Sequence, residues 1–140
     1  MGTQAEAAFV RWAGPRIIQR VGWDKSPLPR EAFWDMPPEI RHLPDFFLFD
    51  ERLFWVEVIG TANLAGFKIR KTKLESQKMY HDKVPLFYFV YHSPSDSYAT
   101  IGWDTVHSGA HTPQKFADGN SYYFLEVNSW TPLRSAPEPS

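Results

Sequence analysis

Apolar and polar positions change their spacing several times along the chain. Residues 4–20 place Phe9, Trp12 and Ile17 among alanines and polar residues, which predicts an N-terminal helix that Gly14-Pro15 breaks or bends. Residues 21–44 hold five prolines and predict an irregular segment with a short helical turn. From residue 45 onward, the dense β-branched and aromatic residues indicate strands instead of helices.

The second half of the pattern predicts a sheet with one further helix. Strands are expected over 45–50 and 53–60 as a hairpin, and over 86–93, 97–103 and 121–127. Residues 67–82 contain strong helix formers without Gly or Pro and predict a helix, and a short helix is expected near 103–107. This order predicts an α/β or α+β fold with a mixed central sheet and a helix on at least one face. Residues 1–130 are expected to form a single domain and 131–140 a flexible C-terminal tail.

Composition narrows the chemistry that this domain can perform. The 140 residues include no cysteine, which excludes disulfides, thiolate zinc sites, iron–sulfur clusters and a cysteine nucleophile. The formal charge of -1 argues against a globally basic DNA-coating protein, although it permits a local basic site. No targeting or membrane segment is visible, so we expect a cytoplasmic protein, bacterial or within a phage-infected host cell, that does not enter membranes.

Glu57 is the most informative residue in the sequence. It lies within an apolar strand, and strand alternation directs it away from the face shared by Val56 and Val58. A carboxylate buried in such a strand is costly without a partner, and a divalent cation shared with Asp45 would be one form of compensation. The alternative is a Glu57 on a sheet edge or on a solvent-facing surface.

These residues resemble a known family. Pro44-Asp45, a hairpin, Glu57 in an apolar strand and a basic helix with Gln77 and Tyr80 are similar to the PD-(D/E)XK nuclease superfamily, in particular its small phage-type or Holliday-junction-resolvase-like members. The resemblance implies a restriction-endonuclease-like core whose acidic residues bind Mg²⁺ or Mn²⁺. It makes Asp45 and Glu57 the metal ligands and assigns Glu6, on the first helix, a place beside them.

The sequence departs from that family at the motif lysine. Ile59 occupies the position two residues after Glu57, where the family has a lysine that assists the attacking water. Two explanations remain open: the lysine has moved to the following helix, or the site is reduced or inactive. Helical spacing puts Lys73 on one stripe with Gln77 and Tyr80, which makes Lys73 the first candidate and Lys71 the second.

The segment around these lysines is basic. Residues 68–83 contain six basic side chains and two acidic ones, a local charge of +4 that leaves -5 for the rest of the chain. Such a patch beside carboxylates would suit phosphate binding, although ordinary surface helices carry similar charges. The expected nucleic-acid contacts are Lys68, Arg70, Lys71, Lys73, Gln77, Lys78 and Tyr80. Among the aromatic residues, Trp23, Trp34, Tyr122 and Tyr123 could stack on bases or belong to the core.

Three functions follow from these observations. The first is a metal-dependent deoxyribonuclease that hydrolyses phosphodiester bonds, with branched DNA or DNA ends as candidate substrates and a homodimer implied only by the resemblance. The second is a catalytically reduced nuclease-fold module that binds DNA or a protein partner without cleavage. The third is a small α+β protein-interaction domain that binds no nucleic acid.

Overall fold

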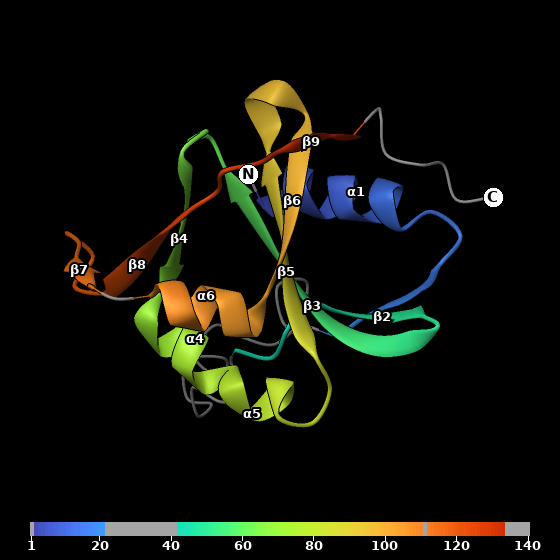
Figure 1. Cartoon of the computed structure of the whole chain (residues 1–140), viewed down its shortest axis with the longest axis horizontal. Coiled ribbons are helices and arrows are strands. Elements are labelled where there is room, and N and C mark those ends of the chain that lie inside the picture. Colours follow the sequence, from blue (N-terminus) through green and yellow to red (C-terminus); the bar gives the residue numbers. More distant parts are fainter. Residues whose placement is uncertain (1, 22–41, 111, 134–140) are drawn as a thin grey trace, which may run out of the picture.

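A computed structural model describes residues 2–21, 42–110 and 112–133 of the chain (Figure 1). Its helices are α1 (Gly2–Ala13), α4 (Lys71–Ser76), α5 (Lys78–His81), the 3-10 turn η1 (Ser93–Ser95) and α6 (Trp103–Gly109). Its strands are β1 (Ile17–Arg20), β2 (Phe46–Asp50), β3 (Arg52–Thr61), β4 (Gly66–Arg70), β5 (Leu86–His92), β6 (Ser97–Gly102), β7 (Gln114–Lys115), β8 (Ser121–Glu126) and β9 (Thr131–Pro132).

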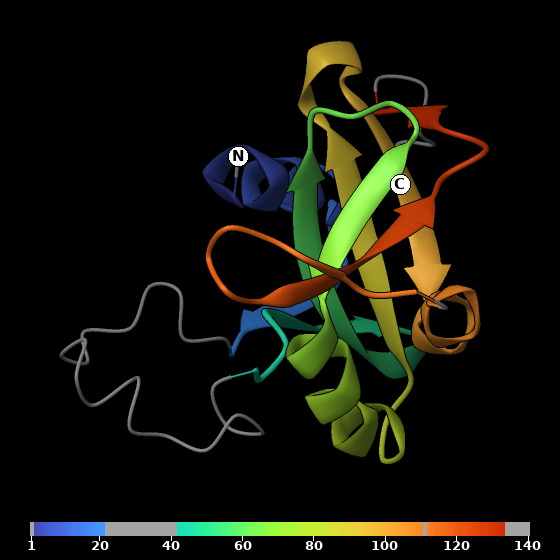
Figure 2. The same ribbon diagram turned by 90° about the vertical axis from the view of Figure 1, so that its left-hand side faces the viewer.

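Within this described part, the strands form two sheets. The larger has six strands in the order β1-β2-β3-β5-β6-β9, and the smaller has three in the order β4-β8-β7. β3 and β5 run parallel, whereas the other neighbours in both sheets are antiparallel. Figure 2 shows β4 and β8 lying in front of the larger sheet. The prediction of a mixed α+β fold with a mixed central sheet is therefore confirmed.

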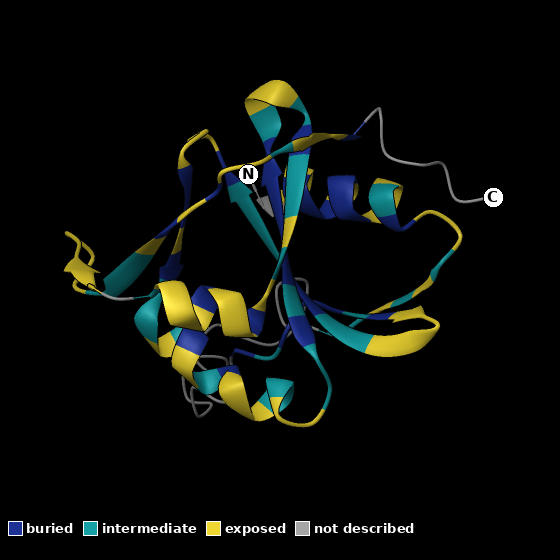
Figure 3. Ribbon diagram, in the orientation of Figure 1, coloured by how far each residue is buried: buried dark blue, intermediate teal, exposed yellow. Residues whose placement is uncertain are grey.

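The two faces of the larger sheet are covered differently. Helix α1 packs Phe9 against Phe46, Val56 and Phe89 on one face. The opposite face carries Leu86, Tyr88 and Val90 of β5 and is covered by apolar residues of β4, α4, α6 and β8, namely Phe67, Ile69, Leu74, Trp103, Val106 and Leu125. Figure 3 shows buried residues concentrated where β3 and β5 cross the middle of the molecule. The middle of β3, at Val56 and Glu57, is thus covered from both sides.

The N-terminal helix is shorter than the prediction. α1 ends at Ala13, Gly14 adopts a φ of 58°, and Ile17–Arg20 forms strand β1 instead of continuing the helix. A positive φ is readily adopted by glycine and ends the helix there. Ile17 then pairs with Phe49 and Arg20 with Phe46, so a contact with residues far along the chain decides the conformation.

The helix predicted over 67–82 is wrong in its first part. Gly66–Arg70 forms strand β4, which pairs with β8, and helical structure begins only at Lys71. Phe67 and Ile69 alternate with Lys68 and Arg70, a period-two pattern that the helix-forming residues of the segment concealed. Lys68 and Arg70 therefore lie on a strand and not on the basic helix.

The remaining predictions of secondary structure agree with the structure within one or two residues. The hairpin of β2 and β3, the buried strand β5, the strands β6 and β8 and the short helix α6 are all present. The predicted irregular segment lies largely outside the described residues, as do 134–140 of the predicted tail. Residues 131–132 of that tail pair with β6 as strand β9.

In the described part of the chain, no helix has the length and apolar character needed to cross a membrane.

Candidate active site

Glu57 lies in the middle of β3 with a neighbouring strand on each side. It pairs with Tyr88 of β5, and its side chain is 1% exposed. It points away from Val56, as alternation predicts, into the face that α4 covers. The alternative of an edge or solvent-facing Glu57 is therefore wrong. A carboxylate at this depth needs hydrogen-bond donors or cations, because burial strongly disfavours an unpaired charge.

Asp45 lies beside Glu57 at the start of β2. The last pair between β2 and β3 joins Phe46 to Val56, so the same register puts Asp45 opposite Glu57 on one face of the sheet. Asp45 is buried, and its Oδ2 accepts a hydrogen bond of 2.8 Å from the backbone N–H of Val58. The Asp45 carboxylate thus contacts the peptide that follows Glu57. Two carboxylates at opposed positions repel each other unless positive charge lies close to both.

Lys73 supplies positive charge at this point. Its ammonium group forms an ion pair with Oε2 of Glu57, and the lysine reaches it from helix α4 while about a third of its side chain remains exposed. Lys71 is the first residue of the same helix. Ile59, at the position of the missing motif lysine, packs instead against the apolar cluster of Trp103 and its neighbours.

Gln77 joins the acidic pair to the body of the protein. It is buried, and its Nε2 donates to Oε1 of Glu57 at 3.2 Å and to the backbone carbonyl of His42 at 3.1 Å. Its Oε1 accepts a hydrogen bond of 2.9 Å from the hydroxyl of Tyr88. These three bonds fix the orientation of the Gln77 amide, which in turn fixes one oxygen of Glu57. Burial, followed by the negative charge of Glu57, raises the pKa of Tyr88 well above its usual 10.0.

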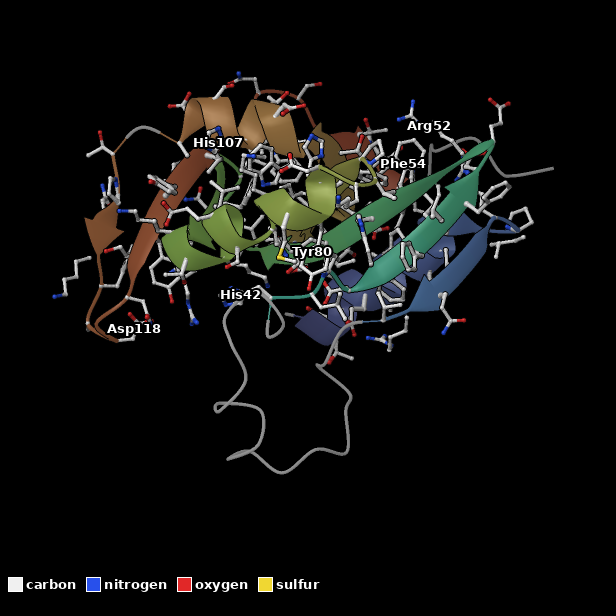
Figure 4. All side chains as sticks on the ribbon, turned by 90° about the horizontal axis from the view of Figure 1, so that it is seen from below. His42, Arg52, Phe54, Tyr80, His107 and Asp118 are labelled. Carbon is white, nitrogen blue, oxygen red and sulfur yellow. The ribbon has the colours of Figure 1, made fainter. Side chains whose placement is uncertain are left out.

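His42 and Tyr88 were not predicted as parts of this network. His42 is buried, and its Nδ1 lies 2.8 Å from the hydroxyl oxygen of Ser76. That hydroxyl donates to the carbonyl of Thr72, so His42 is the donor to Ser76. Alternation along β5 was the available signal for Tyr88, although only the register with β3 brings it to Glu57. Figure 4 views the molecule from the side of α4 and α5, where His42 and Tyr80 lie.

An aromatic group borders the acidic pair on the same sheet face. Phe47 and Trp55, two residues from Asp45 and Glu57 respectively, stack with their ring centres 3.8 Å apart. Tyr80 of α5 meets Trp55 edge to face at 5.3 Å. Tyr80, predicted to contact nucleic acid, therefore braces Trp55. The buried Nε1 of Trp55 has no hydrogen-bond partner among the described residues.

Glu6 is held by a different partner. Both of its oxygens accept hydrogen bonds from Arg20, at 2.9 and 3.2 Å, and its helix packs on the Val56 face of the sheet. Over the described ranges, no three His, Asp or Glu side chains are grouped to hold one metal ion. The structure therefore does not gather Glu6 with Asp45 and Glu57, and its role as a third ligand stays a prediction.

The donor set of Asp45 and Glu57 fits a hard divalent cation. Mg²⁺ is usually held by one or two carboxylates, with waters and substrate phosphates completing its shell. The adjacent carboxylates therefore have the chemistry of a Mg²⁺ or Mn²⁺ site.

The other predicted nucleic-acid contacts are distributed over two elements. Lys78 lies on α5 and forms an exposed ion pair with Asp82 at 2.9 Å. Lys68 and Arg70 lie on β4, where both cations sit over the ring of Tyr122. The structure thus brings Lys73 and Gln77 to Glu57 and leaves Lys68, Arg70 and Lys78 outside that contact.

Comparison with known proteins does not assign the chain to a family. No protein-family model matches the chain, and no curated protein sequence matches it.

Proposed function

We propose that the chain is a metal-dependent deoxyribonuclease with a restriction-endonuclease-like core, related to the PD-(D/E)XK superfamily. The observation that carries the proposal is the ion pair between Lys73 and Glu57 beside Asp45. This contact is the one expected if the motif lysine has moved from position 59 to the following helix. A buried acidic pair with a partly exposed lysine beside it also matches the needs of phosphodiester hydrolysis, in which charge builds up on the phosphate oxygens.

Each residue of the site has a distinct role in this proposal. Asp45 and Glu57 would hold Mg²⁺ or Mn²⁺, which when bound supplies Lewis-acid polarisation of the phosphate and a more acidic water. Gln77 keeps Glu57 in one orientation through the bonds to Tyr88 and His42. Lys73 has part of its side chain exposed, so its ammonium group can turn toward a phosphate oxygen and neutralise its developing charge.

Cleavage of DNA by the purified protein tests the proposal. Linear, branched and single-stranded DNA would be incubated with Mg²⁺ or Mn²⁺ and the products separated by gel electrophoresis. We expect metal-dependent cleavage that falls at least about a hundredfold in Glu57→Gln and in Lys73→Met, since removing one group that stabilises transition-state charge typically costs that much. Lys83→Met, which removes an exposed lysine beyond the site, should cleave like the wild type.

Two results would decide against the proposal. Cleavage that survives Glu57→Gln would place the chemistry elsewhere in the chain. If the wild type binds DNA but cuts none of these substrates with either metal, the chain is a catalytically reduced binding module.

Titration with Mn²⁺ followed by electron paramagnetic resonance gives an independent readout of the metal site. Asp45→Asn should weaken the binding of Mn²⁺ whether or not the protein cleaves DNA.

A further inference from the structure

The outer face of the small sheet combines two exposed aromatic rings, Phe116 and Phe124, and the half-buried Tyr122 with cations. In β4 and β8 the residues that point inward are Phe67, Ile69 and Leu125, which join the core. The residues that alternate with them point outward, and the register pairs Lys68 with Phe124 and Arg70 with Tyr122. Phe116, beyond β7, meets Tyr122 edge to face at 5.0 Å. We call Lys68, Arg70, Phe116, Tyr122 and Phe124 the small-sheet face.

The cations of this face differ from five others in the described part of the chain, which are paired with carboxylates. Lys68 lies over the rings of Phe116 and Tyr122, 4.4 and 5.1 Å from their centres, and Arg70 lies 6.0 Å from the centre of Tyr122. Among the described residues, neither forms an ion pair with a carboxylate. The cations that do so are Arg11, Arg16, Arg20, Lys73 and Lys78. The charge of Arg70 already acts on Asp118, whereas Lys68 has no carboxylate partner among the described residues.

A hollow in the surface continues from this face toward β3. It has a volume of about 780 Å³, and its lining includes Gly60, Thr61, Leu64, Lys68, Tyr122 and Phe124. Of the described residues that line it, Lys68 is the only charged one. Gly60 follows Glu57 by three positions on β3, which corresponds to about 10 Å along a strand. Arg70 directly precedes α4, the helix that carries Lys71 and Lys73.

Two acidic residues limit where an anion can lie. Asp118 accepts a hydrogen bond of 2.6 Å from the hydroxyl of Tyr122, and this bond, more than any other influence, lowers the pKa of Asp118. Glu126 pairs with Gly66 at the other end of β8. Neither of them lines the hollow. The lining of the hollow therefore combines Lys68 with the rings of Tyr122 and Phe124, without a carboxylate among its described residues.

We propose that the small-sheet face and the adjoining hollow bind unpaired nucleotides of the DNA strand that extends from the cleavage site. Stacking of bases on exposed rings, with cations for the phosphates, is the general chemistry of single-strand binding. Duplex DNA keeps its bases stacked on each other and offers no ring faces to Phe124 or Tyr122. The inference rests on the proposed nucleic-acid substrate, and it adds a preference for DNA that carries a single-stranded extension.

Equilibrium binding without metal tests this inference. Fluorescence anisotropy would compare a blunt duplex, the same duplex with a thymidine tail, and the duplex with an abasic tail of equal length. We expect the thymidine tail to raise affinity about tenfold or more over the blunt duplex, and the abasic tail to raise it much less. The variant with Tyr122→Ala and Phe124→Ala should lose the gain while keeping its affinity for the blunt duplex.

Matched variants separate stacking from loss of structure. Phe124 and Phe49 are 43% and 49% exposed, so Phe49→Ala removes a comparable ring at a distant site and should keep the full gain. Phe124→Trp retains a ring and should also keep it. Thermal unfolding of each variant checks that the sheet is intact, and Phe124→Ala alone replaces the double variant if the latter unfolds.

The outcomes distinguish this inference from the proposed function. If the wild type prefers neither tail, or gains as much from the abasic tail as from thymidines, the stacking proposal is overturned even if the protein cleaves duplex DNA. If the double variant retains the gain, the bases stack somewhere else and the proposal also fails. Conversely, a tail preference that depends on Phe124, without any cleavage in Mg²⁺ or Mn²⁺, supports single-strand binding by the small-sheet face and rejects the nuclease.

Discussion

The two faces of strand β3 are built on opposite principles. On one face, Val56 packs with Phe9 and Phe89 in an apolar cluster against α1. On the other face, which α4 covers, Glu57 forms an ion pair with Lys73 and accepts a hydrogen bond from Gln77. Both side chains are almost fully buried, although only one is apolar. The difference shows that depth alone does not decide residue type, since a charge is accepted wherever its partners are buried with it.

The two faces of β3 also contribute differently to stability and to chemistry. The apolar face gains free energy from burial and dispersion and has no reactive group. The polar face gains little from its ion pair, because desolvation offsets the attraction, but it holds charges in fixed positions. Substitutions on the first face should therefore reduce stability, whereas those on the second should reduce stability less and activity more.

The largest stability effect is expected at Phe9. Phe9→Ala removes a fully buried ring from the α1 cluster and should lower the free energy of unfolding by about 3–5 kcal/mol. Val10→Ala on the same helix removes an exposed side chain and should change it by less than about 0.5 kcal/mol. Equilibrium unfolding in urea measures both. Equal losses in the two variants would contradict the assignment of the core to this side of α1.

A smaller effect is expected on the polar face at Gln77. Gln77→Leu keeps the approximate volume but leaves the hydroxyl of Tyr88 and one oxygen of Glu57 without their partner, which should cost about 2–3 kcal/mol. Gln19→Leu changes an exposed glutamine on β1 and serves as the control. The same urea titration compares them. A stabilised Gln77→Leu protein would indicate that the network is not paired as described.

The smallest of these effects concerns Tyr88 and depends on pH. Its pKa is raised in the folded state above the usual 10.0, so the folded protein retains a proton that the unfolded chain releases. This contribution is complete below pH 10.0 and is lost as the pH rises above that value. Tyr88→Phe should cost about 1–2 kcal/mol at neutral pH through the lost bond to Gln77.

The slope of stability against pH supplies the measurement for Tyr88. The free energy of unfolding should fall more steeply above pH 10.0 in the wild type than in Tyr88→Phe. Other tyrosines contribute equally to both proteins and cancel in the difference. Parallel slopes would mean that Tyr88 ionises in the folded protein as it does in the unfolded chain.

Local patterns were enough to predict several parts of this arrangement. Alternation within β3 put Glu57 opposite the valines, and helical spacing put Lys73 and Gln77 on one stripe, where both now contact Glu57. These predictions succeed because the direction of a side chain within one element depends only on the geometry of that element. Strand β4 was missed because the helix formers that follow it, from Lys71 onward, led the predicted helix to be extended back over residues 67–70, which instead pair with β8.

The sequence by itself determined the alternation along β3, the position of Glu57 within an apolar strand, and the absence of cysteine chemistry. Only the tertiary structure decided that Tyr88 and His42 anchor Gln77, and that Lys68 and Arg70 face outward from a second sheet. The physical reason is that strand register and sheet pairing join residues far apart in the chain. No local propensity encodes those contacts, because their free energy exists only when both partners are in place.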